Sequence, residues 1–183
     1  MIALLPFRRP LPTLIALFAA AGFALLAGLA APAMAASAAG PRSLGKFGAW
    51  EAFVDEAQGG KVCYAASLPK ESKNAPRIRS HAYAMVSHRP TEKSFGVVAI
   101  TTGYPMKKGA SALLEAGGTK FDLYTVEGTA WSRDDKAVVA ALIKAKTATF
   151  IGYPAKGEAV ADVYDLSGFN DARAAIDKAC GAK

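Results

Sequence analysis

The sequence has only two histidines and two cysteines among its 183 residues. The histidines, His81 and His88, are seven positions apart in a segment that we expect to be one strand. Side chains an odd number of residues apart lie on opposite faces of a strand. The two histidines therefore cannot bind one metal ion together, and no cluster of histidines and carboxylates has the spacing of metal ligands. The sequence predicts no metal site and no cofactor.

Motifs of the common nucleophilic and phosphate-binding sites are also missing. Ser167, which precedes a glycine, does not complete a Gly-x-Ser-x-Gly motif, and a helix N-cap explains it more simply. No glycine-rich loop with a lysine is present to bind phosphates. Asp122, Asp162 and Asp165 give no sign that two of them converge as the acid and base of a hydrolase. We expect no catalytic residues and no enzyme, and a small periplasmic carboxylate-dependent hydrolase is the alternative.

The two cysteines, Cys63 and Cys180, have neither a Cys-x-x-Cys spacing nor a histidine beside them in the sequence, so redox catalysis is not expected. In an oxidising compartment, a single pair of cysteines is typical of one disulfide. The bond would join residues 117 positions apart. A loop-entropy model gives a crosslink of that reach on the order of 4–5 kcal/mol. Two free thiols are the alternative.

Residues 1–35 have the pattern of a secretory signal peptide. Two arginines precede an uncharged apolar stretch, residues 11–31, which leads to a small-x-small site from Ala33 to Ala35. We expect cleavage between Ala35 and Ala36, and hence a periplasmic or secreted protein with no transmembrane segment after cleavage. A single transmembrane anchor is the alternative, because about 20 apolar residues can cross a bilayer.

Without the two arginines of residues 1–35, the remaining 148 residues carry 20 basic and 15 acidic side chains, a net charge of +5. We expect a flexible N-terminal segment, residues 36–45, and one domain, residues 46–183, which is long enough to bury a core. The basic residues are spread out, and an exported protein does not meet cytoplasmic nucleic acid. Nucleic acid is therefore not an expected partner.

Short β-branched and aromatic runs alternate with glycine turns, a pattern that predicts an antiparallel sandwich or barrel. Phe47, Trp50 and Phe53 are expected in the first strand. Gly117-Gly118 predicts a tight hairpin, because both positions tolerate positive φ. The charged segment 68–80, with two prolines, is expected to be an exposed loop.

Two segments have apolar residues at helical spacing, residues 134–144 and 168–180, the second with Ser167 as its N-cap. Four residues of the second helix share one face: Phe169, Ala172, Ile176 and Cys180. A helix that docks this face on the sheet would bring Cys180 to a strand cysteine. The fold class predicted is mainly β, with a short helix near 134–144 and a C-terminal helix.

One segment, between Lys70 and Lys93, has a marked charge bias. Six basic residues outnumber two acidic ones there, which leaves +4: Lys70, Lys73, Arg77, Arg79, Arg89 and Lys93. These residues are a candidate contact surface for an acidic partner or an anionic surface. The alternative is a sheet edge protected from aggregation by its charges.

Aromatic residues are expected to fill the core and not to form a ligand platform, since this is their commoner role. The prediction covers Trp50, Tyr64, Tyr104, Tyr124, Trp131 and Tyr164.

Three stretches of the sequence are similar to one known family. They are Phe47-Gly48-Ala49-Trp50, Val62-Cys63 and the stretch Tyr164-Asp165-Leu166-Ser167-Gly168-Phe169, which is followed by Ala172, Ala175, Ile176 and Cys180. They resemble the invasion-associated locus B family of small exported bacterial proteins. The resemblance implies an immunoglobulin-like β-sandwich that resides in the periplasm or envelope, and no catalytic residue is carried over from it.

These observations together predict an exported envelope or periplasmic binding or interaction protein, invasion-associated by resemblance only. Its expected partner is an envelope or host protein, or an anionic lipid or glycan surface. Such a protein should expose an apolar or charged patch on the order of several hundred Å². A small-molecule carrier is a further alternative, and it would need an apolar cavity inside the sandwich.

Overall fold

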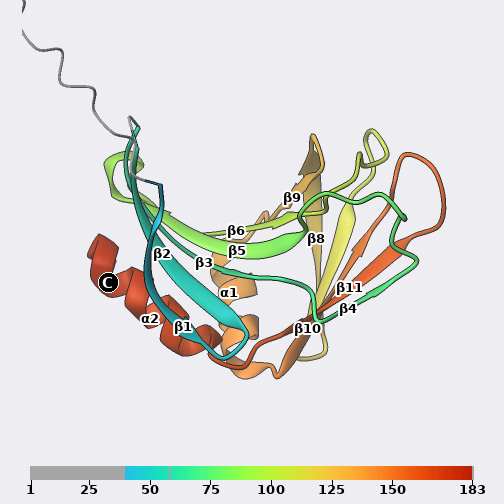
Figure 1. The fold of residues 1–183 in the computed structure, drawn as a ribbon. Helices are drawn as coiled ribbons and strands as arrows, with labels where there is room; N and C mark the ends of the chain where they lie inside the picture. Colours follow the sequence, from blue (N-terminus) through green and yellow to red (C-terminus); the bar gives the residue numbers. More distant parts are fainter. Residues whose placement is uncertain (1–39, 58, 183) are drawn as a thin grey trace, which may run out of the picture. The chain divides into compact units, whose positions relative to one another are not determined.

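A computed structural model describes residues 40–57 and 59–182 of the chain (Figure 1). The predicted signal peptide, residues 1–35, lies outside the described residues. The elements in chain order are β1 (Arg42–Phe47), β2 (Trp50–Ala57), β3 (Gly60–Ser67), β4 (Glu71–Lys73), β5 (Tyr83–Arg89), the 3-10 turn η1 (Pro90–Glu92), β6 (Ser94–Thr101), β7 (Ala112–Ala116), β8 (Thr119–Val126), β9 (Thr129–Trp131), α1 (Asp135–Lys144), β10 (Thr147–Gly152), β11 (Val160–Asp165) and α2 (Phe169–Cys180).

Within the described residues, the strands form one eleven-stranded antiparallel sheet in the order β1-β2-β3-β5-β6-β9-β8-β7-β10-β11-β4. This confirms the predicted mainly β fold with two helices. The two layers expected of a sandwich are halves of this one sheet, since β8 pairs with β9 on one side and with β7 on the other. Trp50 and Val86 from the first half belong to the same buried cluster as Leu114 and Tyr164 from the second.

The two helices cover different parts of the sheet. α1 contacts β6 and β7, and its N-cap is Asp134, whose side chain accepts a hydrogen bond of 3.0 Å from the Ala137 N–H. α2 packs on β1, β2, β3 and β5 through the apolar face predicted from its sequence (Figure 1). The burial of that face is the main reason that α2 forms, because short helices gain most of their stability from packing.

The start of α2 differs from the prediction. Its N-cap is Gly168, with φ 81°, and no side chain caps the helix, so Ser167 is not the N-cap. A Cβ at position 168 would collide with the Phe47 carbonyl, and one at Gly48 would collide with the Ser167 carbonyl. Two glycine turns therefore pack backbone against backbone here, where the Ala49 N–H donates to the Ser167 carbonyl at 3.0 Å.

Two other predictions fail where tertiary pairing decides the structure. Residues 42–45, expected in a flexible segment, form most of β1, and the first expected strand is in fact a hairpin that turns at Gly48 and Ala49. Residues 71–73 of the expected loop 68–80 form β4, which pairs with β11 at the sheet edge. Three exposed residues are too few to show a strand period.

The core is closely filled. The cavity at its centre holds only about 10 Å³ and lies among apolar side chains that include Val86, Leu114 and Tyr164. That is space for about one water molecule. Phe150 is fully buried in this core, whereas Phe95, which we also expected in the core, is 45% exposed. The described core therefore offers no internal space for a carried small molecule.

Candidate binding groove

The first half of the sheet has an apolar face on each side. On β2, Trp50, Ala52 and Val54 are buried on the side that packs on α2. Side chains alternate along a strand, so Glu51 and Phe53 point to the opposite side, which no helix covers in the part of the chain that the structure describes. We call this second side the outer face.

A groove of about 670 Å³ lies on the outer face, across β2, β3 and β5. Leu68 and His81, from the segment that leaves β3 and returns to β5, also line it. The groove has a largely apolar floor, made by Phe53, Tyr64, Ala66, Tyr83 and Met85. A groove of this size with a few polar groups at its margin is typical of a binding site.

A pair of stacked rings forms the centre of the groove. Phe53 on β2 lies opposite Tyr64 on β3, and their ring centroids are 5.1 Å apart with an interplanar angle of 22°. Partial burial, followed by the nearby carboxylate of Asp55, raises the pKa of the Tyr64 hydroxyl. Tyr64 therefore stays neutral and able to donate a hydrogen bond at physiological pH.

The charged side chains in the groove balance each other. Lys46 and Glu51 are register partners on β1 and β2, and both line the groove. The Glu51 carboxylate accepts a hydrogen bond of 2.9 Å from the Ser43 hydroxyl. The groove is thus amphipathic, and it carries no excess of one charge.

Apolar side chains continue along the outer face beyond the groove. Met85, Ala99, Trp131 and Tyr124 are successive register partners across β5, β6, β9 and β8, so their side chains lie on one side of the sheet. Tyr124 is 40% exposed, and its ring lies 5.3 Å from the Arg133 guanidinium carbon. Half of the aromatic prediction is therefore wrong: Trp50, Tyr104 and Tyr164 are core residues, whereas Tyr64, Tyr124 and Trp131 are on the outer face.

The predicted disulfide is present on the opposite side of the sheet. It joins Cys63 of β3 to Cys180 at the end of α2, with 6.0 Å between the two Cα atoms. Both cysteines are buried in the core cluster. The bond fixes the end of α2 to the sheet.

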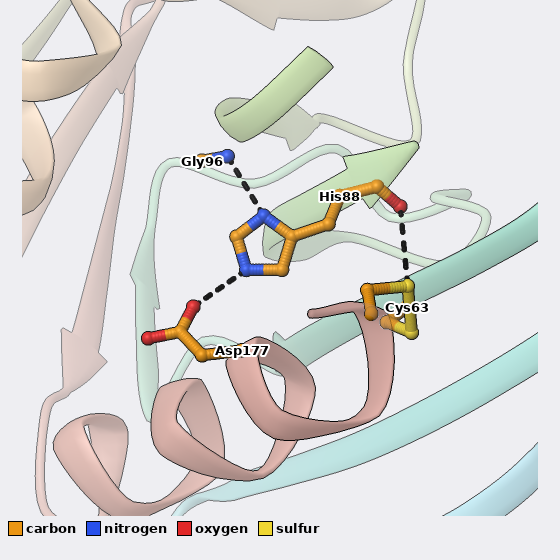
Figure 2. Close-up of a disulfide and its surroundings, with 5 residues drawn as sticks. Cys63, His88, Gly96 and Asp177 are labelled. Carbon is orange, nitrogen blue, oxygen red and sulfur yellow. Dashed lines mark hydrogen bonds and ion pairs between the residues drawn. A yellow bond between two sulfur atoms is a disulfide. The ribbon is translucent and has the colours of Figure 1, made fainter. Parts of the chain in front are cut away.

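A histidine–aspartate pair lies beside the disulfide (Figure 2). His88 Nε2 is 2.7 Å from Asp177 Oδ1, and the Gly96 N–H donates to His88 Nδ1 at 2.9 Å. Because Nδ1 accepts a backbone hydrogen bond, Nε2 carries the ring proton and donates a hydrogen bond to the Asp177 carboxylate. Neither nitrogen is free to act as a general base, so the pair holds α2 to β5 and β6. The expectation that one strand carries both histidines is wrong, because β5 begins at Tyr83 and His81 precedes it. His81 lines the groove, whereas His88 is buried.

The three aspartates considered for hydrolysis have separate structural roles. Asp162 is fully buried and pairs with Arg79, whose Nη1 lies 2.9 Å from Asp162 Oδ1. Asp165 accepts the Ser167 N–H at 2.8 Å, which lowers its pKa, and Asp122 is exposed on β8. No group of three or more potential metal ligands occurs among the described residues.

The six basic residues of the charged segment fall into separate places. Arg79 is used in the buried pair with Asp162, and Arg89 lies 3.9 Å from Glu92 in the turn between β5 and β6, where Lys93 also lies. The other three, Lys70, Lys73 and Arg77, are exposed on the segment between β3 and β5.

Comparison with known families assigns the chain to one of them. A family model described as Invasion associated locus B (IalB) protein matches residues 50–177. The chain belongs to the IalB family. Membership of the IalB family and the disulfide suggest an exported, invasion-associated protein. Comparisons with curated proteins and with solved structures give no match.

Two of the stretches that resemble the IalB family meet in the structure, since the turn at Gly48 packs against the start of α2 at Gly168. No helix of the described residues is long and apolar enough to cross a membrane. The groove itself was not predicted from the sequence. Its signal was there, because β2 and β5 carry large apolar side chains on both faces, as strands do when both of their sides are covered.

Proposed function

We propose that this IalB-family chain is an exported binding protein without catalytic activity, and that it holds a partner in the groove on its outer face. The observation that carries the proposal is the Phe53–Tyr64 stack in a groove of about 670 Å³. Aromatic side chains supply large contact areas in binding sites, and tyrosine adds a hydrogen bond at its polar end.

The carboxylates near the groove do not favour the hydrolase alternative. Glu51 and Asp55 are both on the outer face, four residues apart on β2. Glu51 lines the groove and Asp55 does not, whereas glycosidases use a pair of carboxyl groups in one site. The groove therefore favours binding over this kind of acid–base catalysis.

The balanced charge of the groove indicates the chemistry of its partner. Lys46 and Glu51 offer one donor and one acceptor side chain at the margin of an aromatic floor. An amphipathic surface with little net charge fits best, such as an envelope or host protein segment with exposed apolar side chains.

Affinity capture from envelope extracts, with the oxidised protein as bait, tests this proposal. Three baits are compared: the unchanged protein, the groove variant Phe53→Ser with Tyr64→Ser, and the control Tyr153→Ser, whose tyrosine is 42% exposed and does not line the groove. We expect one partner to be retained by the unchanged protein and the control and lost by the groove variant. Equal retention by all three baits, or no retained partner, would overturn the proposal.

A further inference from the structure

The segment between β3 and β5, residues 68–82, crosses the sheet to pair with β11 before it returns (Figure 1). It carries Ile78, which is 94% exposed, the highest value for any large hydrophobic residue that the structure describes. An isoleucine normally gains free energy when it leaves water. A side chain held this far out calls for a physical reason.

Side-chain hydrogen bonds anchor the segment on both sides of Ile78. The Arg79 guanidinium bonds to buried Asp162 and to the Ser72 hydroxyl at 3.1 Å, and its Nε donates to the Thr102 carbonyl at 2.6 Å. On the other side, the Asn74 amide donates to the Ala159 carbonyl at 3.2 Å. Residues 73–78 therefore lie between Ser72 and Arg79, which contact each other, and we call these residues the tip.

The tip is also positively charged. Residues 73–78 include Lys73 and Arg77 and no acidic residue, a net charge of +2. Lys73 and Arg77 are exposed and form no ion pair with any residue that the structure describes. Lys70 lies outside the tip, where its N–H donates to the Val163 carbonyl of β11 at 2.8 Å. Lys73 and Arg77 are thus the two exposed cations of the tip, and both can bind an external anion.

We propose that residues 73–78 are a docking tip for anionic lipid bilayers. Ile78 inserts at the boundary between headgroups and acyl chains, and Lys73 and Arg77 bind lipid phosphates. An anionic glycan would bind the two cations but leave the isoleucine in water. An apolar protein surface would bury the isoleucine but leave the cations without a partner. One inserted side chain and two cations give weak, reversible binding, as a single short lipid anchor does.

Co-sedimentation of the oxidised protein with vesicles tests the proposal. One set of vesicles contains phosphatidylglycerol and phosphatidylcholine in equal parts, and the other contains phosphatidylcholine alone. We expect binding to the anionic vesicles that falls as salt is raised. The change Ile78→Ser should weaken it about tenfold, and Lys73→Gln with Arg77→Gln should weaken it about tenfold or more.

Matched controls come from α1, where Ile143 is 36% exposed and Lys136 is exposed. The variants Ile143→Ser and Lys136→Gln should bind vesicles like the unchanged protein. The groove variant with Phe53→Ser and Tyr64→Ser should also bind vesicles normally, so failure of the tip and failure of the groove are distinguishable.

Thermal unfolding of each variant shows that a loss of binding is not a loss of folding. Ile78→Ser should leave the melting temperature within the range of the controls, because this side chain has almost no buried surface to lose. Three results would overturn the docking tip: no vesicle binding, equal binding to both vesicle types, or tip variants that bind like the α1 controls.

Discussion

The two faces of the β2–β3–β5 half of the sheet are both apolar, but they are used differently. On the inner face, which is the side that packs on α2, polar groups are both buried and paired. The Trp50 indole donates to the Asp165 carbonyl at 2.9 Å, and His88 forms a hydrogen bond with Asp177. On the outer face, the Phe53–Tyr64 stack lines an open groove. The comparison teaches that an apolar strand face alone does not identify a core, whereas paired polar groups and a covering helix do.

The largest expected effect comes from removing the disulfide on the inner face. The change of Cys63→Ser with Cys180→Ser should lower the free energy of unfolding by about 4–5 kcal/mol, because the loop between the cysteines spans 117 residues. Urea unfolding of oxidised protein measures this. The unchanged protein under reducing conditions is the control, and it should unfold like the double variant. Equal midpoints with and without the bond would contradict the prediction.

Two phenylalanines give the sharpest test of the difference between the faces. Phe169 is 1% exposed and packs edge-on against Trp50, with ring centroids 4.8 Å apart. Phe169→Ala should cost about 3–5 kcal/mol, as expected for a buried phenylalanine. Phe53→Ala, on the open face, should cost about 1 kcal/mol or less.

Urea unfolding of the two variants side by side measures the difference. Similar losses would mean that the outer face is part of the core and that the groove proposal fails.

The alkaline limit of stability probes two buried tyrosines, Tyr104 in the connection after β6 and Tyr164 on β11. Burial raises the pKa of Tyr104 to about 12, and burial also raises the pKa of Tyr164. A tyrosine whose folded pKa exceeds its unfolded value of about 10 stabilises the protein fully below pH 10, and this contribution is lost as the pH rises towards 12. For Tyr104 alone the loss is about 2–3 kcal/mol.

Tyr104→Phe should therefore flatten the fall in stability between pH 10 and 12. It should have little effect at pH 7, because the Tyr104 hydroxyl has no hydrogen-bond partner among the described residues. Unfolding by urea at each pH measures the slope. Tyr153→Phe, which changes an exposed tyrosine, should leave the slope unaltered.

Much of the fold could be predicted because its signals are local. The hairpin at Gly117-Gly118, with φ of 58° and 79°, follows from glycine at both turn positions. Helix α1 follows from the helical spacing of Val138 and Leu142. β4 could not be predicted, because a three-residue edge strand depends on a partner 90 positions away, as in the 2.6 Å bond from Ser72 to Asp162.

The groove depends on the same kind of non-local information. Phe53 and Tyr64 have the composition of core residues, and their alternation with Val54 and Cys63 shows only that they occupy the other face of their strands. Which face α2 covers is decided by residues 169–180, which are more than 100 positions later. The sequence of β2 or β3 alone therefore does not show which of its faces the helix covers.

The position of the disulfide has a consequence for how the molecule is made. A chain that emerges from its N-terminus presents Cys63 long before Cys180, since 117 positions separate them. Cys63 therefore remains without Cys180 until the residues that form most of the sheet have emerged. The bond cannot form before Cys180 has emerged, and by then every strand of the sheet is available to fold.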